Sequence, residues 1–333
     1  MPSTVFNTFI RCATFLSACG LTPAISLAAD SKPPHYPTRP IRFIVPLAPG
    51  GSVDIAARNI APDLSAILGQ QVVIDNRAGA GGNIGADLAA HAPADGYTWV
   101  MGSSSTFGVN PTLYRNLNYN AVRDFAPISL VSLAPNVMVV HPALPTANVK
   151  EFVAYAKARP GKVNFASSGT GGSPHLAGEL FKLVTGVDIV HIPYKSTGQS
   201  LTDLIGGQVQ VSFGTVLALL PQIQAGRLRA LAVTTSHRVD ALPQVPTMGE
   251  VGYPTIIITA WNGVLVPAKT PRPIIQYLHA SLVQVLQKPE VVRQFNSTGA
   301  EVAPNSPEAF GAYIKHEIDR WGKVVRNANL QAQ

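Results

Sequence analysis

Residues 41–68 read IRFIVPLAPGGSVDIAARNIAPDLSAIL, which is a short β-rich run, a glycine-rich turn and a helical segment in direct succession. The run at 41–45 is rich in Ile, Phe and Val, as strands are. From 54 to 68 the apolar residues recur at helical spacing, and Gly69 is a stop signal. Pro62 lies inside that segment and is expected to kink or split the helix. The stretch therefore predicts a strand whose carboxyl end leads through a turn into a helix.

The same alternation of strand and helix continues along the chain. Strands that alternate with helices indicate parallel sheets in an α/β protein. Further strands are expected at residues 72–74, 97–101, 128–131, 137–140, 163–166, 188–192, 209–213, 228–233 and 261–266. Further helices are expected at 83–90, 149–158, 174–184, 200–205, 273–286 and 307–325, with another between 213 and 228 that Pro221 breaks.

Length and composition bound the class of protein. The chain has 333 residues, and a single hydrophobic core rarely supports a chain of that length, so two domains are expected. With 46% hydrophobic and 13% charged residues, it is neither a disordered chain nor a multi-span membrane protein. The net charge of +7 is diffuse, which suits small anionic ligands. Aromatic residues make up only 7%, which argues against a nucleic-acid partner bound by base stacking.

Residues 1–28 are interpreted as a secretory signal peptide. Small and apolar residues fill 12–28, Ser26-Leu27-Ala28 fits the small-x-small cleavage pattern, and polar residues follow at once. We therefore expect cleavage after Ala28. Beyond it no apolar run reaches the length of about 18 residues that a membrane span needs, so the mature chain is expected to be soluble.

The two cysteines, Cys12 and Cys19, both lie within this segment. A competing interpretation is a lipobox at Leu16-Ser17-Ala18-Cys19, in which Cys19 would be lipidated, but the apolar run continues beyond it. Cleavage after Ala28 leaves a mature chain without cysteine. Thiol catalysis, Cys-ligated zinc and disulfides are then excluded.

Three loops that follow expected strands are rich in Gly, Ser and Thr. They are residues 46–54 (PLAPGGSVD), 102–106 (GSSST) and 167–175 (SSGTGGSPH). In open parallel sheets, ligands bind beyond the carboxyl ends of strands, where helices begin. A helix start offers unpaired N–H groups and about half a positive charge to an anion. The alternative is that the loops only cap helices, with Ser52 or Asp54 capping one, and Ser173 capping another whose first helical residue is Pro174.

Enzyme and cofactor motifs are absent or incomplete. The stretch 79–85 (GAGGNIG) fails the dinucleotide pattern because Ile84 stands at its last glycine, so a tight turn into a helix is preferred. No Walker A or H-E-x-x-H motif occurs, and GGSVD at 50–54 and GGSPH at 171–175 both lack the final glycine of G-x-S-x-G. The eight histidines are scattered without metal-ligand spacing. No catalytic residue, metal or cofactor is predicted.

Three residues near the loops have two interpretations each. His175 is interpreted as a structural hydrogen-bonding residue rather than a base. Lys195 could attract an anion, although a solvated surface lysine is the commoner case. Trp261 either belongs to the core or lines a cleft.

An ordered set of short motifs resembles the substrate receptors of tripartite tricarboxylate transporters, also called Bug receptors. The motifs are FIVP at 43–46, APGGS at 48–52 with Asp54, DNR at 75–77, GAGG at 79–82, DGY at 95–97, NPTLY at 110–114, SGTG at 168–171 with HL at 175–176, HIPYK at 191–195, VPT at 245–247 and Trp261. The resemblance runs from about residue 37 to the C-terminus. The chain departs from the family at residues 196–199 (STGQ), where a glycine usually comes first, and at Leu47, where Phe is common.

The resemblance implies a periplasmic receptor with the two-lobed α/β fold of type II periplasmic binding proteins, which has mostly parallel sheets flanked by helices. Residues 37–134 and 254–333 would form the first lobe, and 135–253 the second. The implied ligand is a small organic carboxylate, held in the cleft between the lobes largely by backbone N–H groups and hydroxyls of 50–52 and 168–170. The predicted substrate-binding residues are Ala48, Gly50, Gly51, Ser52, Ser104, Ser105, Ser168, Gly169, Thr170, Ser173, Tyr194 and Thr215.

The resemblance also implies a monomer without catalytic activity that delivers its ligand to the membrane subunits of a transporter. Two alternatives stay open on the sequence: a secreted α/β hydrolase or transferase, and a receptor that signals to a membrane sensor instead of a transporter. Fold alone does not decide between receptor and enzyme. The missing nucleophile–base and metal sets favour the receptor. Dicarboxylates, tricarboxylates, aromatic acids, amino acids and nicotinate-like acids all remain candidate ligands.

Overall fold

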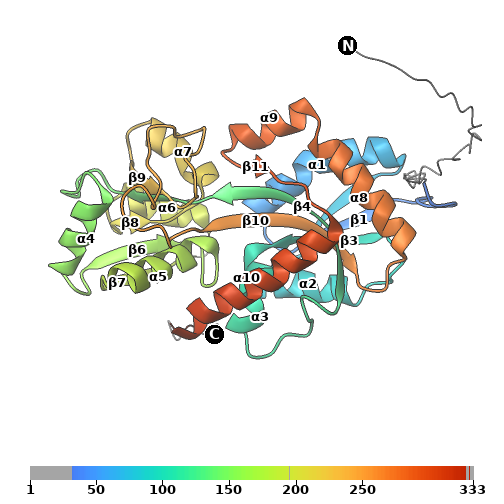
Figure 1. Cartoon of the computed structure of the whole chain (residues 1–333), viewed down its shortest axis with the longest axis horizontal. Coiled ribbons are helices and arrows are strands. Elements are labelled where there is room, and N and C mark those ends of the chain that lie inside the picture. Colours follow the sequence, from blue (N-terminus) through green and yellow to red (C-terminus); the bar gives the residue numbers. More distant parts are fainter. Residues whose placement is uncertain (1–31, 195, 328–329, 331–333) are drawn as a thin grey trace, which may run out of the picture. The chain divides into compact units, whose positions relative to one another are not determined.

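The computed structural model describes residues 32–194, 196–327 and 330. The expected signal segment, with both cysteines and the cleavage site after Ala28, lies outside the described residues, as does Lys195. The described part of the chain consists of two β-sheets with helices packed against them (Figure 1). The predicted α/β class is confirmed.

The larger sheet has six strands in the order β11-β4-β10-β3-β1-β2. These strands are β1 (Ile41–Val45), β2 (Val72–Asn76), β3 (Thr98–Ser103), β4 (Phe125–Pro135), β10 (Thr259–Pro267) and β11 (Glu301–Val302). β1 pairs in parallel with β2 and β3, so that Phe43 lies opposite both Ile74 and Trp99. β10 runs antiparallel to β3 and β4, and β11 is antiparallel to β4. The carboxyl ends of β1 and β3 therefore lie at the same edge of this sheet.

The smaller sheet has five strands in the order β7-β6-β8-β5-β9. These strands are β5 (Val137–Val140), β6 (Val163–Ser167), β7 (Ile189–Pro193), β8 (Val211–Ser212) and β9 (Arg229–Val233). β6 pairs in parallel with β7 and β8, whereas β5 is antiparallel to β8 and β9.

Both sheets are mixed, with a parallel core, and not mostly parallel as expected. The reason is the route of the chain between them. β4 ends at Pro135, a single residue follows, and β5 begins at Val137 in the other sheet. β10 then brings the chain back after β9. β10 runs antiparallel to β3 and β4, and β5 runs antiparallel to β8 and β9. Periodicity in the sequence does not reveal the direction of a strand.

The helices agree with the predicted segments, and some short elements were not predicted. The predicted helices are α1 (Ser52–Leu68), α2 (Asn83–Ala90), α4 (Val149–Lys157), α5 (Ser173–Thr185), α6 (Thr197–Ile205), α7 (Val216–Gln224), α8 (Arg272–Leu286) and α10 (Pro307–Asn327). The elements not predicted are η1 (Ala80–Gly82), η2 (Ser104–Val109), α3 (Asn110–Leu113), α9 (Pro289–Ser297) and strand β11. β11 has only two residues and exists through its pairing with β4, so no local signal marks it.

Prolines do not break the helices in which they lie. α1 continues through Pro62, and α7 continues through Pro221, so the expected splitting of the first helix and the expected break in the second are wrong. Pro62 and Arg58, the residue whose carbonyl loses its intrahelical donor, are both exposed. Water can therefore hydrate that carbonyl, and the helix continues at small cost.

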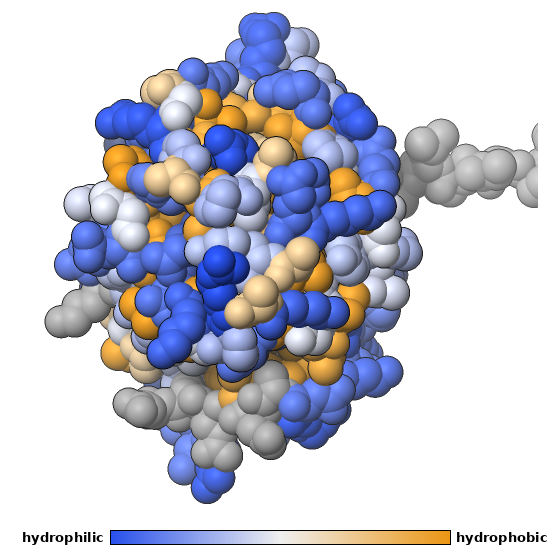
Figure 2. All heavy atoms as spheres, turned by 90° about the vertical axis from the view of Figure 1, so that its left-hand side faces the viewer, coloured by the Kyte–Doolittle hydropathy of each residue, from blue (hydrophilic) through white to orange (hydrophobic). Residues whose placement is uncertain are grey.

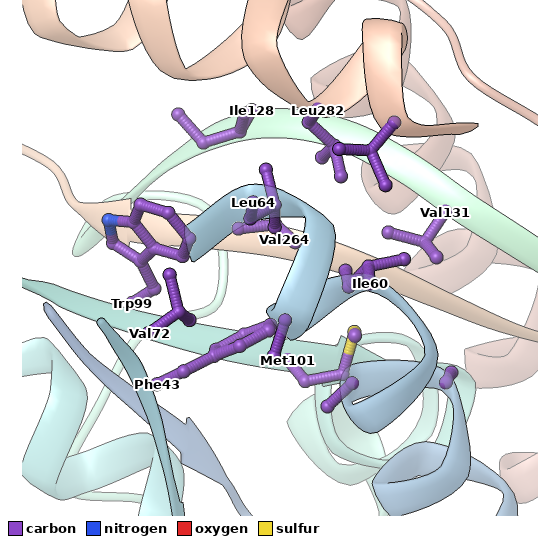
Figure 3. Packing of buried hydrophobic residues seen from close by; sticks show 14 of the residues in the cluster. Phe43, Ile60, Leu64, Val72, Trp99, Met101, Ile128, Val131, Val264 and Leu282 are labelled. Carbon is purple, nitrogen blue, oxygen red and sulfur yellow. The ribbon is translucent and has the colours of Figure 1, made fainter. Parts of the chain in front are cut away.

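The main core lies between the larger sheet and helices α1 and α8. Figure 3 shows Ile60 and Leu64 of α1 facing Phe43, Met101 and side chains of the neighbouring strands. These residues are fully or almost fully buried. Burying a large aliphatic side chain stabilises a fold by about 1.5–3 kcal/mol, so the apolar stripe of α1 fixes this helix on the sheet. The start of α1, which precedes the stripe, is thereby fixed as well.

The helices of the smaller sheet bury one face and solvate the other. In α4 the side chains of Val149, Phe152 and Ala156 are buried, while Lys150 and Lys157 are exposed. Figure 2 shows this side of the molecule, where hydrophilic residues predominate and apolar ones are scattered between them. Such a distribution is that of an ordinary solvated surface.

Candidate ligand-binding site

A cavity of about 330 Å³ lies where strand ends of both sheets meet the starts of several helices. Its glycine and polar lining residues are Gly50, Gly51, Ser52, Ser103, Ser104, Ser105, Ser167, Ser168, Gly172, Ser173, Thr197, Ser200, Ser212, Gly214, Thr215 and Asn262. Its apolar lining residues are Leu47, Val53, Ile55, Pro174, Leu201, Leu204, Leu217, Ala218, Leu219, Ala260 and Trp261. The cavity is therefore rich in hydroxyls and backbone groups on some walls and apolar on others.

The first wall is the loop between β1 and α1. Gly51 is the N-cap of α1, and the first intrahelical bond joins the Ile55 N–H to the Gly51 carbonyl at 2.9 Å. The expectation that Ser52 or Asp54 caps this helix is wrong, because Gly51 holds that position without a side chain. The earlier amides of the first turn have no acceptor inside the helix. Since Ser52 and Val53 line the cavity, this end of α1 offers N–H groups to a ligand.

Asp54 is buried and holds this loop in place. Its Oδ2 accepts hydrogen bonds from the Gly50 amide and from Arg58 Nε, both at 2.9 Å, and its Oδ1 accepts one from Asn76 Nδ2 at 3.0 Å. Asn76 Nδ2 also donates to the Leu47 carbonyl at 3.1 Å. Burial by itself raises the pKa of Asp54, but these hydrogen bonds and the Arg58 charge outweigh it and hold the pKa below its usual value. Asp54 is therefore an ionised brace for residues 47–50.

The second wall follows β3. The chain turns there through the π-helical segment η2, whose N-cap is Ser103. Ser103 Oγ accepts from the Thr106 amide at 3.3 Å and lies 3.0 Å from Ser105 Oγ. A π-helical turn is rare and is frequently found at functional sites. Here it places three successive serines, 103–105, against the cavity.

The third wall is the loop between β6 and α5. The N-cap of α5 is Gly172, and the Leu176 N–H donates to the Gly172 carbonyl at 3.1 Å. The predicted N-cap Ser173 is therefore the first helical residue, and the helix begins one residue earlier than expected. Ser173 Oγ accepts from Asn136 Nδ2 at 3.2 Å, and the same amide donates to the Phe213 carbonyl at 2.7 Å. Asn136 is the residue between β4 and β5, so the connection between the sheets supports this wall.

The remaining helix starts belong to α6 and α7. Ser196 is the N-cap of α6, and its Oγ accepts from the Gln199 amide at 3.3 Å. Thr215 is the N-cap of α7 and lines the cavity together with Thr197 and Ser200. In the part of the chain that the structure describes, the α-helices α1, α5, α6 and α7 thus begin at or beside the cavity.

Most predicted binding residues lie together, and some do not. The predicted residues that line the cavity are Gly50, Gly51, Ser52, Ser104, Ser105, Ser168, Ser173 and Thr215. The predicted residues outside its described lining are Ala48, Gly169, Thr170 and Tyr194. Tyr194 instead donates from its hydroxyl to Asp203 Oδ2 at 2.7 Å, and burial together with this carboxylate raises its pKa to about 12.

Ser200 and Asn262 line the cavity and were not predicted. The segment 196–199, which departs from the family pattern, was a sequence signal for Ser200, because its hydrogen-bonding residues begin a helix beside the cavity. Asn262 follows Trp261. Trp261 is fully buried and also lines the cavity, so it both belongs to the core and lines the site. The Trp261 Nε1–H donates to Glu317 Oε2 at 3.1 Å.

The two other motif interpretations are structural. The stretch 79–85 forms the turn η1 and the start of α2, as preferred over a dinucleotide loop. A side chain at Gly85 would place its Cβ 2.7 Å from Pro46 Cα, so glycine is needed where these segments touch. His175 is buried, and its Nδ1 accepts from the Gly171 amide at 3.1 Å, which makes it the expected hydrogen-bonding residue.

The cavity has no formally charged side chain among its described lining residues. Within the ranges 32–194 and 196–327, no group of three or more His, Asp or Glu residues is placed to hold a metal ion. No helix in the described part of the chain is both long enough and apolar enough to cross a membrane. What the site offers a ligand is therefore helix N-termini, hydroxyls and apolar walls.

The model of the tripartite tricarboxylate transporter family receptor matches residues 56–330 of this chain. The chain belongs to this receptor family. Protein BugT from Bordetella pertussis (strain Tohama I) is 42% identical over 318 residues, which cover 95% of this chain and 96% of BugT. This extent of identity confirms the resemblance derived from the sequence motifs.

Two solved structures that are similar to this chain carry an acid as their ligand. The R. palustris protein Rpa4515 with adipate is 36% identical, with a TM-score of 0.83 and coverage of 89% of this chain and 99% of that one. MatC from Rhodopseudomonas palustris with bound malate is 31% identical, with a TM-score of 0.79 and coverage of 87% and 100%. The fold is thus that of the periplasmic binding proteins of this family. The chain is a solute-binding receptor and not an enzyme.

Proposed function

We propose that this receptor binds a small organic carboxylate in the cavity and delivers it to the membrane subunits of a tripartite transporter. The observation that carries the proposal is the meeting of the α1 and α5 starts at one cavity without a charged lining side chain among the described residues. Each start contributes about half a positive charge, so the two together offset about one anionic charge. Hydroxyls of Ser52, Ser168 and Ser173 supply further donors.

The two lobes are proposed to comprise residues 37–134 with 254–333, and residues 135–253. The cavity lies between elements of both, which supports ligand-favoured closure about the connections near Asn136 and between β9 and β10. The periplasm is the proposed location, supported by the sequence of residues 1–28 and by the family. The receptor is proposed to act as a monomer.

The experiment that tests the proposal is native mass spectrometry of the purified protein, followed by identification of the released ligand. A thermal-shift series with adipate, malate, benzoate and nicotinate complements it, because a ligand that binds only the folded state raises the melting temperature. We expect at least one carboxylate to be released unchanged and to stabilise the protein. Stabilisation by the amide or methyl ester of an acid to the same degree as by the acid would contradict a carboxylate site.

A further inference from the structure

Two histidines lie stacked beside residues 167–173 of the cavity wall. The ring of His175, on α5, lies 3.8 Å from the ring of His191, on β7, with an angle of 18° between the planes. The ring of Phe165, on β6, stacks on His191 at 4.9 Å. His175 is only 2% exposed, and the His191 ring covers one of its faces.

Each ring is hydrogen-bonded to the loop. The Gly171 amide donates to His175 Nδ1 at 3.1 Å. His191 Nε2 lies 2.6 Å from Ser167 Oγ, and this hydroxyl in turn donates to the Gly169 carbonyl at 3.0 Å. The pair therefore touches the loop at both ends, on either side of Ser168, which lines the cavity.

The bond to Gly171 requires a neutral His175. An N–H donor can bond to Nδ1 only when this nitrogen carries no proton, so the proton of the neutral ring is on Nε2. Nε2 lies 3.9 Å from Glu179 Oε1, which favours that tautomer. Protonation of Nδ1 would turn two N–H groups toward each other and release the Gly171 amide.

The surroundings keep the ring neutral. Burial comes first, followed by His191 and Lys182, and together they lower the pKa of His175 to about 3. Among the residues that the structure describes, Glu179 is the only carboxylate within ion-pair distance of either ring, and Lys182 Nζ lies 3.1 Å from its Oε1. β6 contributes the uncharged Phe165 and Ser167. Uncovering the ring would remove the largest of these causes and move its pKa toward the ordinary value of about 6.5.

We infer that His175 and His191 are positioning residues for the ligand site: His175 holds the Gly171 amide, and the His191 ring covers His175 so that it stays an acceptor at neutral and mildly acidic pH. The inference rests on the proposed function in so far as the wall formed by residues 167–173 contacts the carboxylate. It adds a device that makes the geometry of this wall independent of pH.

The first measurement needs no ligand. Nitrogen NMR of histidine-labelled protein reports the tautomer of His175, and hydrogen exchange, corrected for the intrinsic rate, reports the protection of the Gly171 amide at about pH 7 and about pH 5. In the wild type we expect the Nε2–H tautomer and, relative to the global stability measured at each pH, equal protection at both pH values. An Nδ1–H tautomer at about pH 7 would overturn the inference.

Matched variants separate the role of His175 as hydrogen-bond acceptor from the role of His191 as the ring that covers it. His175→Phe keeps a ring but has no acceptor, so Gly171 protection should fall about fivefold at both pH values. His191→Ala uncovers His175, so protection should fall by a similar factor at about pH 5 only. His191→Phe keeps a flat cover and should show no pH dependence. Full protection in His175→Phe, or the same pH profile for His191→Ala and His191→Phe, would refute the positioning role.

The same variants are then titrated with adipate and malate. His316→Gln, a substitution of an exposed histidine on α10, serves as the control and should bind as the wild type does. If neither acid binds the wild type while tautomer and exchange behave as expected, the proposed ligand class fails and the positioning role stands. If the acids bind the wild type and every histidine variant equally at both pH values, the positioning role fails and the proposed function stands.

Discussion

The Gly50 amide donates a 2.9 Å hydrogen bond to Asp54 Oδ2, so the first turn of α1 holds the loop that leads into it. The same carboxylate accepts from Asn76 at the end of β2 and from Arg58 one turn further along α1. A single buried side chain thus joins a loop, a helix and a strand. The glycine-rich wall of the cavity is held in position by a residue that is not in the cavity lining.

Substitution of Asp54 is therefore expected to lower both stability and ligand affinity. In Asp54→Ala, the Gly50 amide and the Asn76 side chain lose a buried acceptor, which corresponds to about 1–3 kcal/mol of unfolding free energy. Urea denaturation measures the stability, and calorimetric titration with the acid identified by mass spectrometry measures the affinity. Arg58→Gln is the matched variant, because it removes only the exposed partner and should change stability less. Equal effects of the two substitutions would contradict the role of Asp54 as the brace.

The sequence around Asp54 predicted the strand, the turn and the helix, because each depends on local composition and spacing. The cap was predicted wrongly, because Gly51, one residue before Ser52, holds the N-cap position in an extended conformation and makes no side-chain hydrogen bond. The π-helical turn after β3 was not predicted. The direction of β10 could not be predicted either, because its antiparallel pairing with β3 and β4 joins segments more than a hundred residues apart in the chain.

The candidate site could be predicted only in part for the same reason. Gly-Ser loops after strands are local signals, and those before α1 and α5 do line the cavity. Asn262 reaches it through the packing of β10, which no motif encodes, and Ser200 was indicated only indirectly, by the hydrogen-bonding residues at 196–199. The support of the site by Asn136 and by the histidine stack likewise depends on contacts between distant segments.

The hydroxyls of Ser52 and Ser168 should contribute separately to binding. Ser52 is the first residue of α1, and Ser168 follows β6 of the smaller sheet; both line the cavity. A hydrogen bond to a charged group contributes roughly 1.5–3 kcal/mol, so Ser52→Ala and Ser168→Ala should each weaken binding by about one to two decades. Calorimetry with the identified acid measures this, and Ser297→Ala, on α9, is the control. Unchanged affinity in both cavity variants would place the carboxylate elsewhere.

Stability should fall as the pH falls below about 6.5, because the histidine stack is neutral in the folded state. Burial is the main cause that lowers the pKa of His175 to about 3 and that of His191 to about 4, against about 6.5 in the unfolded chain. Below that value the unfolded chain binds more protons. Each ring then removes about 1.4 kcal/mol of unfolding free energy per pH unit until the folded state is protonated as well.

Urea denaturation between about pH 7.5 and about pH 5 measures how the stability depends on pH. Most carboxylates titrate below this range, so they contribute little to the change. The double variant His175→Phe/His191→Phe should have a flatter profile than the wild type over that interval. It is expected to be less stable at neutral pH, since its loop amide lacks an acceptor. Parallel profiles for the two proteins would show that the stack is not the source of the pH dependence.

Glu317 should be required for the position of Trp261 in the cavity wall. Its buried Oε2 accepts from Trp261 Nε1 at 3.1 Å and from Trp321 Nε1 at 2.8 Å. Glu317→Leu would leave two buried indole N–H groups without an acceptor, at about 2–5 kcal/mol of stability. Glu317→Gln keeps an acceptor and should be milder. Tryptophan fluorescence and denaturation measure both variants, and an emission maximum unshifted in Glu317→Leu would contradict this arrangement.

Ligand binding is expected to depend only weakly on salt. The loops 46–54 and 167–175 contain no Arg or Lys, and the described lining residues carry no formal charge. If helix starts and hydroxyls hold the carboxylate, the interacting dipoles are fixed within the site, where mobile ions screen poorly. A buried lysine or arginine would first have to lose its hydration, which offsets much of its attraction. The dissociation constant should then rise by less than about threefold between low salt and about 0.5 M NaCl. At this salt concentration an exposed ion pair would be screened within a few ångströms and would weaken more.

Lys195→Met provides the internal comparison and should cause only a modest loss of affinity. A tenfold or larger salt effect that disappears in Lys195→Met would mean that an ion pair, and not the backbone and hydroxyl groups, carries the carboxylate.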